Sequence, residues 1–446
     1  MKKTLIISLI AFTAFGYLTA QSEIQNEEKI KKGWTFGAFP VFGYDSNTGF
    51  KYGGFLSLYD YGDGTKYPQY NQRLNLELSR TTKGSGTNQL TYDTKNFIPG
   101  VRMLAEASFL TEKVLNFYGF NGYNSYYDPA FENKEDPLFK SQVFYRMERS
   151  MLKMKLEFIG KLKGDNLKWF GGVEYLNNKL DTVDIDNLNE GKDPADMIQS
   201  TGGGLYGDFI RWGLIPEDQI NGGGTSIFKI GAKFDTRDNE ANPMKGLWTE
   251  LQFLVSPSFL SDGYGYTRMA FTHRQYFTII SKKVNFAYRF SYQAKLTGEI
   301  PFHMLPLVYN SAPQLTLSGL GGAKTMRGIM RNRVAGDDFI YGNAELRWKV
   351  IKTVILNQNF YIALAGFADA GMITGNYKLP EVTNPQFKDE AEAWLSAGDP
   401  EKLHVSYGFG LHFAVNDNFI VTWDYGLAAD KRDGKKGTYI GMGFLF

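Results

Sequence analysis

Residues 339–350 read Phe-Ile-Tyr-Gly-Asn-Ala-Glu-Leu-Arg-Trp-Lys-Val, and this stretch decides the fold. Its polar and charged side chains alternate with a second, mostly apolar set. The first set is Phe339, Tyr341, Asn343, Glu345, Arg347 and Lys349, and the second is Ile340, Gly342, Ala344, Leu346, Trp348 and Val350. Successive side chains of a strand point to opposite faces. The pattern therefore predicts a strand with water on one side and an apolar medium on the other, which is typical of a transmembrane β-barrel.

Similar two-sided runs recur along the chain. We expect strands at 33–43, 49–59, 71–82, 87–97, 101–111, 141–162, 167–179, 225–235, 246–256, 264–278, 284–296, 339–350, 358–370, 404–414, 418–428 and 437–446. Most of these runs have the length that a tilted membrane strand needs. The sequence thus predicts an all-β fold, a transmembrane antiparallel β-barrel of sixteen strands that occupies residues 33–446.

The connections between these runs fall into two classes. Long connections follow odd-numbered strands, at 112–140, 180–224, 297–338 and 371–403. Short ones follow even-numbered strands, at 98–100, 163–166 and 415–417. Outer-membrane barrels have short periplasmic turns and long outer loops, so the pattern also predicts the orientation of the barrel.

One run, 141–162, allows two interpretations. Its polar residues occupy even positions at Arg146, Glu148 and Ser150 and odd positions from Lys153 onwards. A single strand with a bulge near 149–151 explains the change of phase. A tight turn at the same place would give seventeen strands and invert every later loop; we favour the bulge.

The N-terminal residues predict export. Lys2 and Lys3 precede an apolar run, and Ala20 ends it, so residues 1–20 resemble a secretory signal peptide. Residues 21–32 would then be a short periplasmic segment. The chain has 49 basic and 47 acidic residues, and two of the basic ones lie in the leader. Such a balance gives no reason to expect nucleic acid as a partner.

Composition supports the barrel. The chain has 49 glycines, 27 tyrosines and 35 phenylalanines, with a mean hydropathy of −0.31, which suits strands that meet two solvents. It has no cysteine, and therefore neither a disulfide framework nor a thiol for a lipid anchor. A soluble β-sandwich is the alternative, but it would have to place Glu345, Arg347 and Lys349 on one solvated face and would not explain the two classes of connection.

Four motifs in order resemble one family, the BamA/TamA-type outer-membrane barrels known as bacterial surface antigen proteins, which include two-partner secretion transporters. The motifs are Phe234-Asp235-Thr236-Arg237-Asp238 with Pro243 and Gly246, Met326-Arg327-Gly328-Ile329 after the eleventh strand, Phe367, Asp369 and Gly371 on the thirteenth, and an aromatic strand that ends at Phe446. The resemblance covers essentially the whole mature chain. Met326 and Ile329 depart from the family pattern, which has valine and an aromatic residue there.

The resemblance implies that the sixth outer loop enters the barrel lumen and is locked there. Arg327 would pair with Asp369 on the inner wall, beside Phe367 and Gly371, and Gly328 would allow close approach of the backbone. The alternative is that Arg327 is an exposed loop arginine.

No enzyme is expected. Asp235, Arg237, Asp238 and Gly246 resemble a structural periplasmic turn more than a metal site or a catalytic dyad. The four histidines lack ligand spacing, and the glycine runs at 202–204 and 222–224 lack the lysine of a phosphate loop. Two acidic outer loops, 184–196 and 389–401, are weak candidates for calcium. We expect no cofactor and no metal.

Both strands that must close the barrel look weak. Trp34 begins the first strand, and Pro40 removes one hydrogen-bond donor from it. Gly441 and Gly443 weaken the last strand, which ends at Phe446. Family members that assemble proteins present periplasmic domains before the barrel, whereas only residues 21–32 precede the first strand here. We therefore expect a member that lacks these domains.

The resemblance implies an outer-membrane protein of a Gram-negative bacterium that inserts or translocates proteins, or lipids. Its partners would be outer-membrane lipids, unfolded client proteins and a separate periplasmic partner. A passive or gated pore without assembly activity is the alternative.

Overall fold

This computed structural model describes residues 32–446 apart from 47, 66–69, 201, 241, 311–315, 356–357, 383 and 416–418. The leader expected at 1–20 lies outside the described residues. So does the segment expected at 21–32, apart from Lys32.

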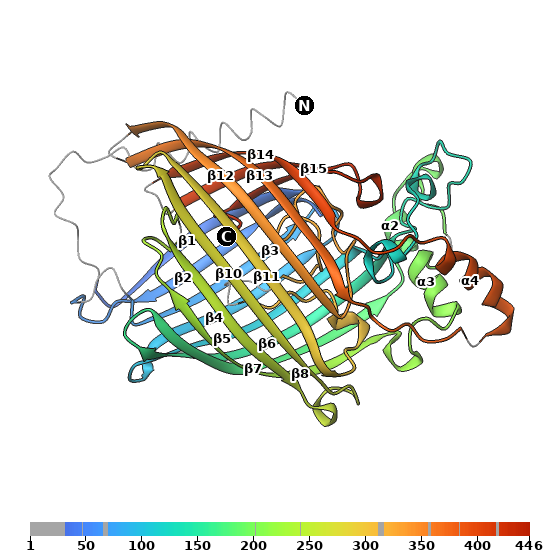
Figure 1. Ribbon diagram of the computed structural model, residues 1–446, viewed down its shortest axis with the longest axis horizontal. Helices are drawn as coiled ribbons and strands as arrows, with labels where there is room; N and C mark the ends of the chain where they lie inside the picture. The colour runs from blue at the N-terminus through green and yellow to red at the C-terminus, as the bar shows by residue number, and fades with distance from the viewer. Residues whose placement is uncertain are drawn as a thin grey trace.

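The described residues form sixteen antiparallel strands that close into one barrel (Figure 1). The strands are β1 (Trp34–Asp45), β2 (Gly49–Asp60), β3 (Gln72–Thr81), β4 (Gly86–Ile98), β5 (Val101–Asn116), β6 (Arg146–Lys163), β7 (Leu167–Asp181), β8 (Gly222–Asp235), β9 (Gly246–Ser256), β10 (Tyr266–Ile280), β11 (Val284–Gly298), β12 (Asp338–Ile355), β13 (Gln358–Gly375), β14 (His404–Val415), β15 (Phe419–Ala428) and β16 (Lys436–Met442). The predicted sixteen-stranded barrel is confirmed, and closure of the ring excludes two packed sheets.

The strand expected at 141–162 needs a correction. β6 is one strand, as favoured, but it pairs with β7 in unbroken register from Glu148 to Lys161. The irregularity instead lies on β5, between Glu112 and Leu115, opposite β6. Met147, Arg149, Met151 and Lys153 are all buried on the inner face, so the phase does not change. Glu148 is polar because it faces outward near the rim, where it bonds to Lys113 at 2.7 Å.

The prediction of a strand at 437–446 is also wrong at its C-terminal end. β16 stops at Met442, and Gly443 has a φ of +80°, a left-handed conformation that turns the chain out of the sheet. Phe446 is buried rather than lying at the end of a membrane strand.

The two ends of the barrel differ. The long connections that follow odd-numbered strands share one end, which we call the loop end; the opposite end is the turn end. Figure 1 shows the short helices α2 (Ile185–Asn189), α3 (Gly204–Arg211) and α4 (Lys388–Ser396) gathered beyond the loop end. No helix among the described residues is long and apolar enough to cross a membrane.

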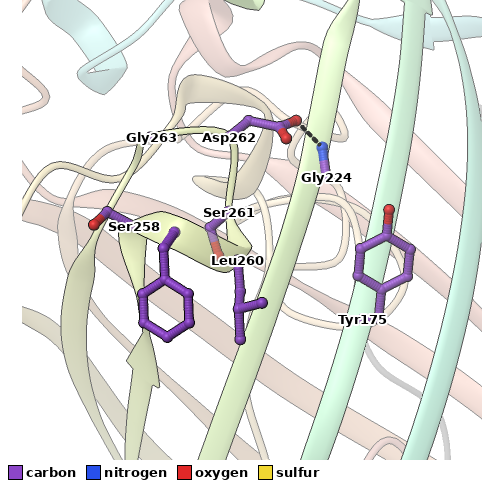
Figure 2. Close-up of a pocket in the computed structure, with 8 residues that line it drawn as sticks. Tyr175, Gly224, Ser258, Leu260, Ser261, Asp262 and Gly263 are labelled. Atoms are coloured by element: carbon purple, nitrogen blue, oxygen red, sulfur yellow. Dashed lines mark hydrogen bonds between the residues drawn. The ribbon is translucent and has the colours of Figure 1, made fainter.

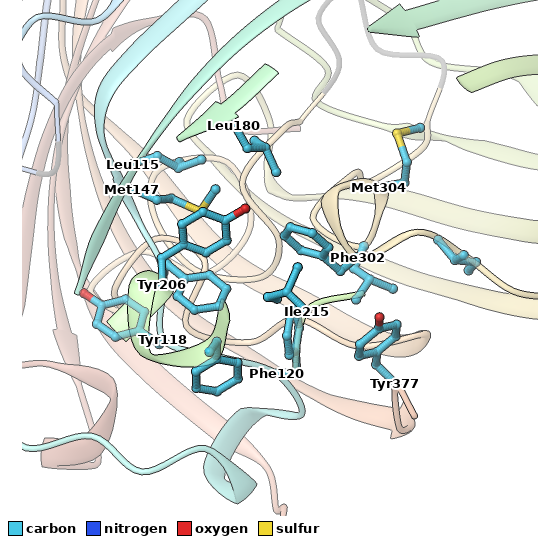
Figure 3. Close-up of a cluster of buried hydrophobic side chains, with 14 of the residues drawn as sticks. Leu115, Tyr118, Phe120, Met147, Leu180, Tyr206, Ile215, Phe302, Met304 and Tyr377 are labelled. Carbon is cyan, nitrogen blue, oxygen red and sulfur yellow. The ribbon is translucent and has the colours of Figure 1, made fainter. Parts of the chain in front are cut away.

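Buried aromatic side chains of these connections form a dome over the loop end. Phe120, Tyr206, Phe302 and Tyr377 come from four different connections and pack into one cluster (Figure 3). Phe120 is 4.8 Å from Tyr377 and 5.9 Å from Phe302 between ring centroids. The dome therefore joins the long loops into one packed layer.

The outer wall is apolar and the inner wall polar. On β12, Leu346 and Trp348 are about half exposed, whereas Glu345 and Arg347 are buried toward the lumen. The predicted alternation of residues 339–350 is thus confirmed, with the charged face inside.

Candidate functional site: a lumenal lock and an incomplete seam

The described part of the sixth loop, residues 299–310 and 316–337, folds back against the inner wall because its glycines permit tight turns. Gly321 and Gly322 both have positive φ, and the Gly321 amide donates to Thr325 Oγ1 at 2.8 Å. Gly328 has a φ of +96°, and a Cβ there would lie 2.6 Å from the backbone of Gly426 on β15. Any side chain at 328 would push the loop off the wall.

Arg327 lies next to Gly328, where the sixth loop comes close to the inner wall, and it is 1% exposed. Its Nε and Nη2 donate to the two carboxylate oxygens of Asp369 at 3.0 and 3.1 Å, and its backbone amide donates to Asp369 Oδ2 at 3.0 Å. The guanidinium also lies 3.4 Å from the ring centroid of Phe367. The structure thus brings Arg327, Phe367 and Asp369 together in a bidentate, stacked arrangement.

Two further carboxylates, which the motifs did not indicate, surround the same guanidinium. Arg327 Nη1 donates to Glu345 Oε2 at 2.9 Å and lies 3.4 Å from Asp424 Oδ2. Arg347 Nε in turn donates to Glu345 at 2.7 Å, and His412 Nε2 lies 3.0 Å from Asp424 Oδ1. The alternation in 339–350 had placed Glu345 and Arg347 on one face, but no motif marked Asp424 or His412.

Apolar packing also holds the sixth loop against the inner wall. Met326 and Ile329, the two departures from the family pattern, are buried in one cluster. Its other members are Val308, Leu320, Val334, Phe339, Tyr341 and Ile373. A Cβ at Gly371 would lie 2.9 Å from Met326 Sδ and from the Ile340 carbonyl oxygen. Gly371 therefore leaves the space that Met326 fills.

Arg331 is not a free loop charge. Its Nη2 donates to Glu112 on β5, and its Nε donates to Ser318 Oγ at 2.6 Å. The loop is also held from β16, since the Gly328 amide donates to the Tyr439 hydroxyl at 3.1 Å.

The seam between β1 and β16 is incomplete. Two residue pairs, Tyr44 with Ile440 and Asp45 with Tyr439, join these strands, whereas twelve pairs join β1 to β2. Ser46 adds hydrogen bonds to Thr438 at the loop end. Toward the turn end, residues 34–43 have no strand partner on β16 among the described residues.

The residues expected to weaken the seam lie along this gap. Trp34 is 58% exposed at the turn end, and Pro40 pairs with Gly54 of β2 on its other side. Gly441 pairs with Thr422 of β15, immediately beyond the last pair with β1.

The segment 443–446 enters the lumen. Arg347 Nη2 donates to the backbone oxygen of Phe446 at 3.2 Å, and its guanidinium lies 4.0 Å from the Phe444 ring centroid. Phe446 packs with Tyr276 and Ala287 of the inner wall. Arg347 therefore touches both this segment and Glu345, which holds Arg327.

The motif after β8 forms a structural turn. Asp235 accepts hydrogen bonds from Arg237 Nε at 2.9 Å and Nη2 at 2.8 Å. Asp238 Oδ1 accepts from the amides of Met244 and Lys245. Gly246 has a φ of +100°, and a Cβ there would lie 2.3 Å from the Thr236 oxygen. Within the described residues, no three acidic or histidine side chains meet in a way that would hold a metal ion.

Comparisons with protein-family models and with solved structures relate this chain to known proteins. The model of the Omp85 superfamily domain matches residues 41–446. Among solved structures, BamA from Haemophilus ducreyi lacking POTRA domains 1–3 has 14% identity and a TM-score of 0.54, with 93% of this chain and 71% of that chain covered. CdiB from Escherichia coli has 11% identity and a TM-score of 0.54, with 95% and 66% covered.

No curated protein matches the chain. At these identities the two structures share the fold, and this chain spans roughly two thirds of their length.

Proposed function

Because this chain belongs to the Omp85 superfamily and is a Gram-negative outer-membrane β-barrel, we propose that it inserts or translocates client proteins at the outer membrane. The working part in this proposal is the seam between β1 and β16. The proposed activity is non-enzymatic, since strand exchange and transport need no catalytic group.

The observation that carries the proposal is the two-pair seam. An unpaired backbone donor or acceptor within a bilayer costs several kcal/mol, so natural barrels close fully. Here residues 34–43 of β1 leave such groups without a β16 partner. A strand of another chain that pairs with this edge would satisfy them.

We propose that the sixth loop controls the seam through the lock formed by Arg327, Gly328, Phe367, Asp369 and Gly371. Arg347 connects the two parts, because it bonds to Glu345 on one side and to the backbone oxygen of Phe446 on the other. Release of Arg327 would change the charge balance around Glu345 and loosen the segment 443–446.

The partners in this proposal are unfolded client proteins, outer-membrane lipids and a separate periplasmic partner. The turn of Asp235, Arg237, Asp238 and Gly246 has a structural role in it. Its hydrogen bonds fix the connection between β8 and β9 at the turn end, where a periplasmic partner would approach.

A second candidate is a gated pore. Its support is that the sixth loop lies against the inner wall and the aromatic dome covers the loop end. Such an arrangement would shut a pore until the loop moved.

Reconstitution distinguishes the two candidates. The purified protein is placed in liposomes, an unfolded client barrel is added, and protease-resistant client is measured against empty liposomes. Ion conductance is recorded on the same preparation. Faster client insertion supports the assembly function, whereas steady conductance without insertion overturns it in favour of the pore.

A further inference from the structure

A hollow opens on the outer face of the barrel near the loop end, and we call it the rim hollow. It has a volume of about 510 Å³ and lies between β7, β8 and the connection that follows β9. Figure 2 shows Tyr175 and Gly224 on one side of it and Ser258, Ser261 and Asp262 on the other. Phe259 in this connection is 85% exposed.

A second hollow of about 640 Å³ runs over the wall from β4 to β8, and we call it the wall groove. Strand register places its outward side chains in two adjacent rows: Leu90, Ala107, Met154 and Tyr175, then Tyr92, Ala105, Leu156, Val173 and Phe228. Ala105 and Ala107 form a low floor between larger neighbours.

The two hollows adjoin, since Tyr175 and Leu260 line both. The result is a polar site at the membrane rim next to an apolar groove in the membrane-facing wall. This shape matches a lipid, with a head in the first hollow and an acyl chain in the second.

The polar site favours a cationic head. Asp262 Oδ2 accepts the Gly224 amide at 2.6 Å, and a carboxylate has capacity for further donors. Tyr175, Ser258 and Ser261 supply hydroxyls, and none of the described residues that line the hollow is Lys or Arg. Burial lowers the pKa of the neighbouring His303 to about 4, so it is neutral at pH 7 and does not neutralise Asp262.

We propose that the rim hollow and wall groove form one binding site for an outer-leaflet lipid that carries an ammonium group on its head. The ammonium group bonds to Asp262 and the nearby hydroxyls, and one acyl chain lies over Ala105 and Ala107. The site is far along the sheet from the β1–β16 seam, so it does not depend on the proposed insertion activity.

The test uses the full protein in detergent and measures bound lipid by native mass spectrometry. Phosphatidylethanolamine and phosphatidylglycerol with identical acyl chains are titrated separately, as probes with and without the ammonium group. We expect about tenfold tighter retention of phosphatidylethanolamine, because phosphatidylglycerol is anionic and would be repelled by Asp262. Equal retention of the two lipids would overturn the head-group assignment.

Two variants separate head from chain. Ala107→Trp fills the groove and should reduce retention of both lipids at least fivefold. Its control is Ala368→Trp, at an exposed alanine of β13. Asp262→Asn, which tolerates the left-handed backbone at this position, should remove the preference while leaving the chain site intact. Unchanged retention in Ala107→Trp, with heat-dependent gel migration confirming the fold, would overturn the groove.

Discussion

At the scale of single residues, the lumen holds an arginine among three carboxylates. Arg327 contacts Asp369, Glu345 and Asp424, so its charge alone does not balance them. Arg347 supplies a second positive charge beside Glu345, and His412 Nε2 lies 3.0 Å from Asp424 Oδ1. A buried charge that loses its partner is costly, often about 3–5 kcal/mol. The network therefore depends most on the residue at its centre.

We expect Arg327→Ala to destabilise the seated loop by about 3–5 kcal/mol, because it leaves several buried carboxylates without their shared partner. Asp369→Ala should cost less, about 1–3 kcal/mol, since Glu345 and Asp424 still hold the arginine. Protease cleavage of the sixth loop in detergent measures both.

The double variant, Arg327→Ala with Asp369→Ala, should lose clearly less stability of the seated loop than the sum of the losses in the two single variants. Full additivity would show that the two residues do not interact. Lys324→Ala is the matched control, because this side chain in the same loop is exposed and should change the cleavage rate little.

The dome should be sensitive to pH through Asp208 in α3. Burial raises the pKa of this carboxyl to about 6, above the ordinary value of about 3.9. The folded dome thus binds this proton more tightly than the unfolded chain, so the contribution of Asp208 to stability is greatest below about pH 4 and is lost as pH rises through 6. Asp208→Asn should flatten this dependence.

Hydrogen exchange at residues 204–212, corrected for the intrinsic effect of pH on amide exchange, measures this change. The same pH dependence in wild type and in Asp208→Asn would assign it to another group.

Sequence predicted part of this chemistry, and the reason for the rest is physical. Arg327 and Asp369 stand in recognisable motifs, and the alternation of 339–350 predicted that Glu345 lies on the polar face of its strand. Asp424 joins the site only because β15 lies beside the loop after the barrel closes, as the approach of Gly328 to Gly426 shows. Arg331 and its partner Glu112 lie 219 residues apart in the sequence, so no local pattern could pair them.

At the scale of elements, the alternation of polar and apolar side chains gave a wrong prediction for the end of β16. Residues 437–446 alternate as a strand would, but one glycine with positive φ redirects the last four residues into the lumen. Side-chain periodicity predicts which face of the sheet a residue occupies if the strand continues. It does not show whether a neighbouring strand is present to pair with that residue.

We expect Gly443→Val to extend β16 along β1. A left-handed φ costs a residue with a Cβ roughly 1–2 kcal/mol, and no atom lies within 4 Å of a Cβ built there, so the backbone conformation is the main obstacle. Disulfide formation between Phe42→Cys and Met442→Cys, the pair that would follow in register, should increase. Gly441→Val, in the same strand with ordinary φ, should not increase it; equal yields from both variants would contradict this account of the turn.

The loops should have the orientation that their lengths indicate. Epitope tags near Lys192 and Asp389, both at the loop end, should react with antibody on intact cells. A tag near Asn239, in the turn after β8, should react only after the outer membrane is permeabilised. A reactive Asn239 tag together with hidden Lys192 would mean that the barrel is inserted the other way round.

At the scale of the whole molecule, the described part of the barrel is well paired except along the seam between β1 and β16. The dome covers the loop end, the sixth loop lies against the inner wall, and neighbouring strands other than β1 and β16 share at least seven residue pairs. The weak line is the seam, and the segment 443–446 leaves it for the lumen. We therefore expect the barrel to open sideways into the membrane at this seam.

A disulfide across the seam tests directly whether activity requires the seam to open. The chain has no natural cysteine, so no other disulfide can form. Tyr44→Cys with Ile440→Cys places two thiols on directly paired residues, at a separation that a disulfide can bridge. The control, Leu364→Cys with Leu411→Cys, staples β13 to β14, which are already fully paired. Client insertion into liposomes is measured for both before and after reduction. We expect the oxidised seam variant to be inactive and to recover on reduction, while the control is active throughout. Full activity with the seam locked would show that insertion does not need the seam to open.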